Sequence, residues 1–227
     1  MSVARKVFLE ILRAATAGLG IAAFAALVSP LYGQADEVIY STISGDPEAP
    51  RRHFRVKNPA KLTMEEAGEI YRNLAGDMAL GFAASGYETA QGYQGWLPAS
   101  LAPYRSATHG QRYANNYVNS VAQAYLQYEQ AGRLPVGSLL AKDSFTVTAD
   151  GKVEPGPLFT MEKMPPGFSY VSGDWRYAMV MPDGTLFGET RGQGAERVKY
   201  CIDCHLAQED QDHLFFVPEP YRITLDQ

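Results

Sequence analysis

The chain has 227 residues, 46% of them hydrophobic and 20% charged, and a formal net charge of -5 at pH 7. This length suffices for one domain with a sizeable core, and no internal repeat or second block of composition indicates another. The acidic balance argues against nucleic acid and against anionic membranes as partners.

The first residues have the pattern of a secretory signal peptide. Three basic residues precede an uncharged run at 14–28, and Gly33 and Ala35 give a small-x-small cleavage pattern. The run of 15 residues is shorter than the roughly 20 of a membrane span. We predict that residues 1–35 are a signal peptide and that the protein is periplasmic. An uncleaved anchor is the less favoured alternative.

The next segment predicts an extended arm and then a helix. Residues 36–60 are rich in Pro and charge and have no apolar period, as in an arm or loop. Thr63 and Glu66 have the spacing of a capping box, and apolar residues then repeat at helical spacing as far as Met78. Gly86 is expected at or just beyond the end of this helix.

A long loop and a second helix are expected next. Residues 87–111 are dense in Gly, Pro and Tyr. Side chains at helical spacing then predict a helix whose tyrosine stripe is explained most simply as core. These are Tyr113, Tyr117, Val121, Tyr125 and Tyr128. Gly132 would cap this helix, and Pro135 bars its continuation.

After Pro135 the pattern changes to strands and tight turns. "SLLAKDSFTVT" and "RYAMVM" are β-prone, while "ADGK" and "PDGT" are turn sequences, the second leading into "LFGE". Prolines among these segments exclude a helical bundle. We therefore predict an α+β fold, a mostly antiparallel β-sheet with flanking helices, with the domain covering residues 61–227.

The two cysteines of the chain lie in "KYCIDCHLAQ" near its C-terminus. Cys-x-x-Cys-His is the attachment motif of c-type haem, because two thiols one helical turn apart add to the two haem vinyl groups. The following imidazole binds the iron. The motif predicts one covalent haem c per chain, held by Cys201, Cys204 and His205.

Other roles for the cysteine pair fit less well. A structural zinc needs four ligands, and the chain has no further cysteine. A thioredoxin-like redox pair is expected early in a βαβ unit, which is not predicted here. A plain disulfide leaves His205 without a role.

Three further strings resemble the cytochrome P-460 family and its relative cytochrome c′-beta. They are "GRLPVGSLLAKDSF", "PLFTMEKMPPGFSYVSGDWRYAMVMPDG", and "CIDCH" followed by "DHLFF". The resemblance covers about residues 109 to 222. Its most specific elements are the Gly-Asp-Trp entry at Gly173, the lysine at 142 and the C-terminal position of the haem motif.

The resemblance implies a fold, a cofactor and a class of ligand. It implies one haem per subunit, usually in a homodimer, with His205 as the proximal ligand and the distal side open to small nitrogenous ligands. Enzymatic members oxidise hydroxylamine, and their electrons would pass to a periplasmic partner such as another cytochrome.

Three further site residues follow from the resemblance. Lys142 matches a lysine that joins the porphyrin edge in enzymatic members; the alternative is a solvated strand lysine. Glu162 matches a distal carboxylate that acts as a proton acceptor; the alternative is a salt bridge to Lys163 or another surface partner. Arg112 stands where a distal arginine is expected, although the string "SATHGQRYANNYV" departs from the family pattern.

No sixth iron ligand is assigned from the sequence. The candidates, none of which we assign to iron, are His109, His213, Met161, Met164, Met179 and Met181. An open distal site favours a hydroxylamine-oxidising enzyme or a nitric oxide binding protein. A simple electron carrier usually has a sixth protein ligand. Trp175 is expected in the core.

Overall fold

The computed structural model describes residues 50–223, whose centre is an antiparallel eight-stranded sheet. The predicted signal peptide and the first part of the predicted arm lie outside the described residues. Six strands follow the order β1-β3-β4-β6-β7-β8, while β2 pairs with β3 and β5 pairs with β4. With its flanking helices, this sheet confirms the predicted α+β class.

The strands are short except for the central one. Their bounds are β1 Leu97–Pro98, β2 Tyr104–Arg105, β3 Tyr113–Val118, β4 Leu139–Val147, β5 Val153–Pro155, β6 Leu158–Lys163, β7 Trp175–Val180 and β8 Leu186–Glu189. The α-helices are α2 Met64–Ala83 and α3 Ala195–His205. The 3-10 helices are η1 Glu88–Ala90, η2 Tyr93–Gly95, η3 Ser120–Gln130, η4 Tyr170–Ser172, η5 Leu206–Gln211 and η6 Glu219–Tyr221.

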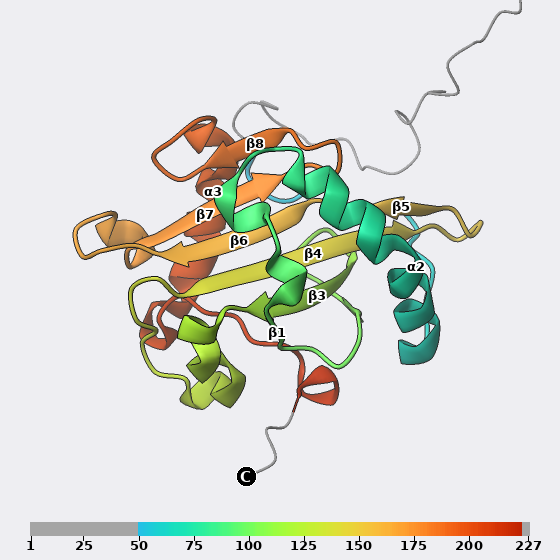
Figure 1. Cartoon of the computed structure of the whole chain (residues 1–227), viewed down its shortest axis with the longest axis horizontal. Coiled ribbons are helices and arrows are strands. Elements are labelled where there is room, and N and C mark those ends of the chain that lie inside the picture. The colour runs from blue at the N-terminus through green and yellow to red at the C-terminus, as the bar shows by residue number, and fades with distance from the viewer. Residues whose placement is uncertain (1–49, 224–227) are drawn as a thin grey trace, which may run out of the picture. The chain divides into compact units, whose positions relative to one another are not determined.

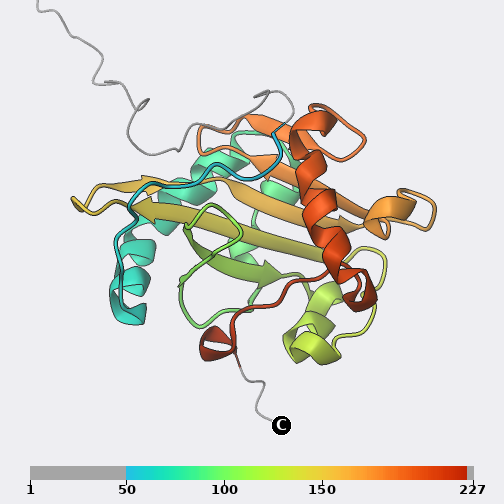
Figure 2. The same cartoon turned by 180° about the vertical axis from the view of Figure 1, so that it is seen from behind.

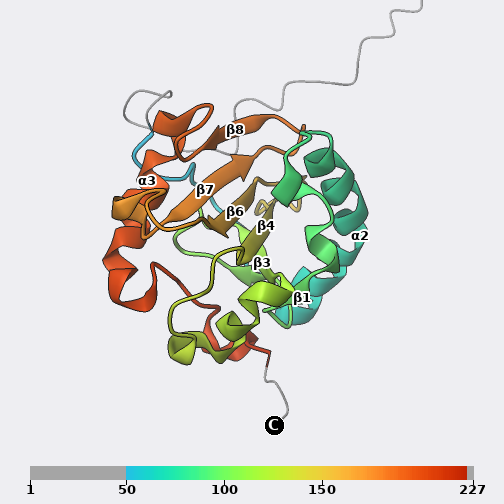
Figure 3. The same ribbon diagram turned by 60° about the vertical axis from the view of Figure 1, so that its left-hand side comes forward.

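Helices α2 and α3 cover opposite faces of the sheet. Helix α2 crosses the front of the sheet in Figure 1, and α3 crosses the back in Figure 2. Figure 3 shows the strands between the two helices. The sheet therefore has an α2 face and an α3 face, and successive residues of each strand point to alternate faces.

The start of α2 follows from its sequence. The Thr63 side chain accepts a hydrogen bond from the Glu66 backbone N–H, and the Glu66 carboxylate accepts one from the Thr63 N–H. The predicted capping box is thereby confirmed. The helix ends before Gly86, which has a positive φ of 67°. Its buried side chains, Ala67, Met78 and Phe82, pack on the α2 face.

The second predicted helix is wrong over its first half. Residues 113–118 form strand β3, which pairs with β4 along its whole length, and only Ser120–Gln130 turns helically, as 3-10 helix η3. A spacing of four residues keeps Tyr113 and Tyr117 on one face of a helix, but it does so on a strand as well. The tyrosine spacing was therefore ambiguous, and pairing with β4 decided the outcome.

The described part of the predicted arm is extended and packs on the sheet domain. Val56 is buried, and its N–H donates to the Gly110 carbonyl at 2.9 Å. The Ala60 N–H donates to the Val147 carbonyl at 2.7 Å. Residues 50–60 thus belong physically to the domain they precede. Among the described residues, no helix is both long and apolar enough to cross a membrane.

Candidate haem site

Helix α3 carries the cysteine motif along the back of the sheet. Cys201 and Cys204 lie one turn apart, and His205 is the last residue of the helix. The two thiols are free; Cys201 is buried and Cys204 is exposed. Burial raises the pKa of the Cys201 thiol to about 12. Burial also raises the pKa of the Cys204 thiol. Both sulfurs are therefore protonated thiols at neutral pH, and they are not joined to each other.

The imidazole of His205 is held in one orientation. Its Nδ1 lies 2.7 Å from the carbonyl oxygen of His213, while the rings of Tyr177 and Phe215 each lie with their centroids 5.0 Å from its own. Burial lowers the pKa of His205 to about 4, so the ring is neutral near pH 7. A neutral imidazole whose Nδ1–H is bound to a carbonyl presents Nε2 to a metal.

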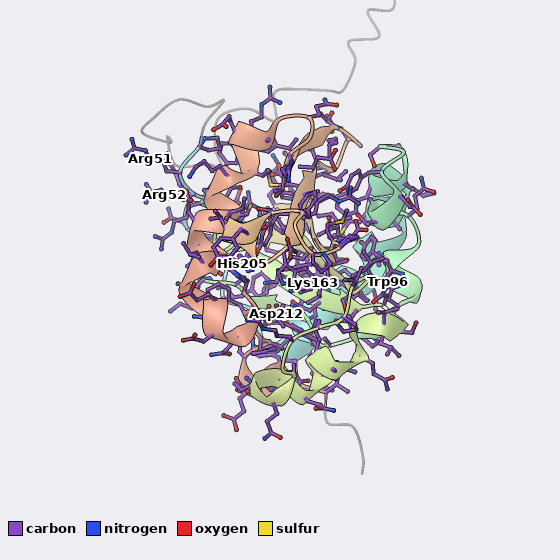
Figure 4. The ribbon with its side chains drawn as sticks, turned by 90° about the vertical axis from the view of Figure 1, so that its left-hand side faces the viewer. Arg51, Arg52, Trp96, Lys163, His205 and Asp212 are labelled. Atoms are coloured by element: carbon purple, nitrogen blue, oxygen red, sulfur yellow. The ribbon has the colours of Figure 1, made fainter. Side chains whose placement is uncertain are left out.

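The turn that carries this carbonyl is fixed by a buried ion pair. Lys163 Nζ lies 2.5 Å from Asp212 Oδ1 and donates to the Gly173 carbonyl at 2.9 Å. Trp175, fully buried, donates from Nε1 to the Asp212 carbonyl at 2.7 Å. Figure 4 shows His205 on the α3 side of the molecule and Lys163 between His205 and Trp96, with Asp212 just below them. The orientation of His205 therefore rests on strands β6 and β7.

A cavity of about 720 Å³, counted with its open mouth, lies between α3 and the sheet. Its walls are mainly apolar and aromatic, with a few polar groups. They include Cys201, Cys204, His205, Lys142, His53, His109, Asn116, Leu140, Phe159, Met161, Tyr177, Leu214 and Phe215.

Lys142 reaches this cavity from the middle of the sheet. It lies on β4, opposite Asn116 of β3 and Phe159 of β6, and all three line the cavity. Burial lowers the pKa of the Lys142 amine to about 8, while the nearby Cys204 raises it. With this pKa roughly a tenth of the amine is unprotonated at pH 7, and the unprotonated form is the one that a nucleophilic nitrogen requires.

The family of the chain is decided by comparison with family models. The model of the family described as Cytochrome P460 matches residues 90–216, more than half of the chain. The chain belongs to the cytochrome P460 family. A comparison with curated proteins gives no match. Membership of this cytochrome family implies a haem cofactor.

The cavity of this P460 protein fits a haem. Two free thiols and a neutral imidazole at its α3 wall are the donor set that such a group requires. Within the described part of the chain, the buried Tyr177 hydroxyl has no hydrogen-bond partner, although it lines the cavity. A buried hydroxyl without a partner is unfavourable, so Tyr177 offers a hydrogen bond to a group bound in the cavity.

Glu162 is not brought to the cavity. It follows Met161, which lines the cavity, and strand alternation turns its side chain to the α2 face. There its carboxylate accepts hydrogen bonds from Arg176 Nε, at 3.1 Å, and from Arg176 Nη2. A carboxylate used in this ion pair does not face a ligand in the cavity.

Arg112 lies beside the cavity and is not among the residues that line it. Its guanidinium is fully buried, and Nη1 donates to the carbonyl of Phe54 at 2.7 Å and to that of His109 at 3.3 Å. It thereby joins the N-terminal arm to the loop before β3. Arg112 thus holds two backbone segments together by hydrogen bonds, and one of these segments carries His53.

Two cavity residues were missed by the sequence reasoning. His109 was considered and not assigned, because a histidine in a polar loop is seldom a ligand, and His53 lies in a segment with no periodic signal. Both line the cavity. The departure of "SATHGQRYANNYV" from the family pattern was the one sequence signal at this place. His213 and Met179 do not line the cavity, whereas Met161 does.

Proposed function

We propose that this protein is an exported monohaem c-type cytochrome that acts on hydroxylamine or nitrogen oxides. The observation that carries the proposal is the convergence of Cys201, Cys204, His205 and Lys142 on one cavity in a member of the P460 family. The cysteines would form thioether bonds, and His205 would be the protein ligand of the iron. Export is required because haem c is attached outside the cytoplasm.

Haem, when bound, supplies a redox-active iron and a coordination position for a small ligand. The chain's own residues orient the group and exclude water. The His213 carbonyl holds the Nδ1 proton of His205, and the apolar rings of Phe159 and Phe215 form walls of the cavity. A hydrogen bond of this kind raises the basicity of a ligating imidazole.

Lys142 supports the enzymatic form of the proposal. Its amine lies in the same cavity as the cysteines, with a pKa of about 8. Placement in the cavity and an unprotonated amine are two conditions for a bond from the lysine to the porphyrin edge. The bond would replace one N–H and one porphyrin C–H bond by a C–N bond and release two protons and two electrons, so the proposal includes a two-electron oxidant such as a peroxide. We include this bond in the proposal, together with oxidation of hydroxylamine and transfer of its electrons to a periplasmic partner such as another cytochrome.

A second candidate is a non-catalytic protein that binds nitric oxide. One observation favours it: no Asp or Glu is among the described residues that line the cavity. A hydroxylamine oxidase needs a proton acceptor near the substrate, and Glu162 faces away. The homodimer expected from the resemblance is a further part of the proposal and applies to both candidates.

The first experiment tests the haem and its attachment. The protein is matured with haem in a periplasmic expression system and examined by mass spectrometry under denaturing conditions and by absorption spectroscopy. We expect the mass of one haem to remain on the denatured chain. Cys201→Ser with Cys204→Ser should lose it. Asp203→Ala, an exposed change between the two cysteines, should keep it.

The second experiment separates the enzyme from the binding protein. Lys142→Leu should keep both thioethers, while its spectrum shifts toward that of an ordinary c-type haem and hydroxylamine-dependent reduction of an electron acceptor falls steeply. If the wild-type spectrum is already ordinary and the variant changes neither spectrum nor turnover, the nitric oxide binding function replaces the enzymatic one. A fully low-spin wild-type iron with two protein ligands would favour an electron carrier instead.

A further inference from the structure

A pair of histidines lies in the cavity at some distance from the haem attachment residues. The rings of His53 and His109 stack with centroids 4.7 Å apart, and both meet the ring of Phe159 edge-on at 4.8 and 4.9 Å. His205 instead contacts Tyr177 and Phe215. Phe159 and Tyr177 belong to β6 and β7, and Tyr177 lies opposite Met161, two residues along β6 from Phe159. The strand positions that the pair and His205 contact are therefore two residues apart along the sheet, a rise of about 7 Å.

The Nδ1 atom of each ring is already occupied. His53 Nδ1 lies 2.9 Å from the Tyr200 hydroxyl. His109 Nδ1 lies 3.1 Å from both the Ser106 and the Thr108 hydroxyl. No hydrogen bond to the Nε2 atom of either ring is found among the described residues, and both rings line the cavity. The Nε2 atoms are polar groups that this end of the cavity offers to a ligand, together with the Lys142 amine.

The partner of His53 is compatible with a proton on Nε2. Burial raises the pKa of the Tyr200 phenol well above its usual range, so the hydroxyl keeps its proton. It lies 2.9 Å from His53 Nδ1 and 3.9 Å from the Met179 sulfur, which makes Nδ1 the nearer of its two acceptors. Burial, with the charges of Arg112 and Lys142, lowers the pKa of His53 to about 3, so the ring is neutral. A neutral imidazole that accepts at Nδ1 carries its hydrogen on Nε2. Such an N–H donates hydrogen bonds and does not bind a metal.

The backbone holds the two histidines together. Arg112 joins the carbonyl of His109 to that of Phe54, the residue after His53. Gly110, with φ at 75°, allows this approach, because a Cβ there would lie 2.1 Å from the Phe54 carbonyl oxygen. His53 precedes residues 90–216, which the family model matches, whereas His109 lies within them, so the pair joins the arm to the family-matched region. Figure 4 shows Arg51 and Arg52, just before His53, directed away from the cavity.

We propose that His53 and His109 form the distal wall of the ligand site and that the His53 Nε2–H donates a hydrogen bond to a small ligand on the iron. The pair would take the role that a distal carboxylate was expected to have. Among the described residues, no carboxylate lines this cavity. The ligand class is a small molecule with an accepting atom beyond the one bound to iron, such as a nitrogen oxide. This inference rests on the proposed haem site.

The test uses haem-loaded protein and carbon monoxide as the probe. A hydrogen bond to the oxygen of iron-bound carbon monoxide increases back-donation and lowers the C–O stretching frequency. We expect His53→Phe to raise that frequency in the ferrous complex. We also expect it to weaken azide binding to the ferric protein about two- to tenfold, the equivalent of one hydrogen bond. His53→Gln, which keeps an N–H donor, should restore most of both values.

Two companion variants sharpen the test. Tyr200→Phe leaves His53 in place but removes the hydroxyl that sets its tautomer, so the C–O band should broaden or split as both tautomers become populated. Tyr71→Phe perturbs a buried hydroxyl on the α2 face and should leave the C–O stretch unchanged.

Three results would overturn the inference. An unchanged C–O stretch in His53→Phe and in His109→Phe, with haem attached, would make the pair a packing element. A low-spin wild-type iron that becomes high-spin in either variant would make that histidine an iron ligand. Wild-type protein without covalent haem would contradict the proposed function itself, and mass spectrometry distinguishes this from the other two results.

Discussion

The two faces of the sheet differ in whether their buried polar groups have hydrogen-bond partners within the described chain. On the α2 face, Asp143 accepts hydrogen bonds from the hydroxyls of Tyr71 at 2.6 Å and Tyr93 at 2.9 Å. On the α3 face, its neighbour Lys142 points into a cavity where the Tyr177 hydroxyl has no partner within the described chain. Since buried polar groups are normally paired, the Asp143 cluster of the α2 face is complete by itself, whereas the α3 face offers an unpaired hydroxyl to a bound group.

The strongest test of this contrast removes the bound group. In the double variant of Cys201 and Cys204 to serine, the cavity stays empty. We expect amide hydrogens of α3 and η3 to exchange roughly 100-fold faster or more, because large cavities cost about 3 to 5 kcal/mol. Helix α2 should keep its protection. Equal loss of protection on both faces in hydrogen-exchange mass spectrometry would show that the faces do not differ in this way.

The next largest effect concerns the ion pair that positions His205. Lys163 and Asp212 have side-chain exposures of 12% and 4%. Lys163→Met leaves Asp212 buried without its partner, which should lower the free energy of unfolding by about 3 to 5 kcal/mol. The matched control is Lys199→Met, which breaks an exposed pair with Asp203 at 59% and 58% exposure.

The control should cost less than about 0.5 kcal/mol. Denaturant unfolding of the haem-loaded proteins measures both changes. Equal effects would mean that the turn after α3 does not depend on its buried pair. The ligand-field spectrum of Lys163→Met should also change, because the His213 carbonyl that orients His205 follows Asp212 directly.

On the α2 face, the contribution of Asp143 to the stability of the fold should depend on pH. Burial raises the pKa of Asp143 from 3.8 to about 6, although the hydrogen bonds from Tyr71 and Tyr93 act in the opposite direction. The folded protein therefore binds a proton more tightly than the unfolded chain. This stabilisation is complete below about pH 4 and is lost as the pH rises through 6. Its size is at most about 3 kcal/mol.

Asp143→Asn removes this titration. The difference in unfolding free energy between wild type and variant should therefore change between pH 4 and pH 7, with the wild type losing stability relative to the variant as pH rises. A difference that is constant with pH would show that Asp143 titrates normally. Urea unfolding at several pH values gives the comparison.

The smallest expected effect is that of Glu162. Its pair with Arg176 is partly exposed, with side-chain exposures of 22% and 29%. Glu162→Gln should therefore change stability by less than about 1 kcal/mol. Because it lies on the α2 face, carbon monoxide binding and the haem spectrum should not change. A large loss of hydroxylamine turnover in this variant would return Glu162 to the role that the sequence predicted.

The sequence predicted the local features of the fold better than the long-range ones. The capping box at Thr63 and the turns of the β4–β5 and β7–β8 hairpins each depend on residues that are close together in the sequence. The structure contains all of them. Strand β3 was mistaken for a helix because a spacing of four suits both, and only its pairing with β4 resolves this. The family and the fold class followed from motifs that stay together in the chain.

The residues of the candidate site also fall into those that could be predicted from neighbouring residues and those that depend on distant contacts. Cys201, Cys204 and His205 adjoin in sequence, so their convergence was predictable. The cavity wall at His53 was not, because that residue comes into place through contacts with Tyr200, 147 positions away. The face on which Glu162 lies depends on strand register, which a one-residue shift reverses.

The position of α3 in the chain has a consequence for assembly. Every strand of the described sheet precedes this helix. A chain made from its N-terminus therefore presents the apolar lining of the α3 face, including Phe159 and Tyr177, before the attachment cysteines have emerged. Until then the sheet is an open half-site with an exposed apolar surface, which favours aggregation. Haem can thus be enclosed between α3 and the sheet only in chains that include the C-terminal helix, and chains that stop before Cys201 should be aggregation-prone substrates for proteolysis.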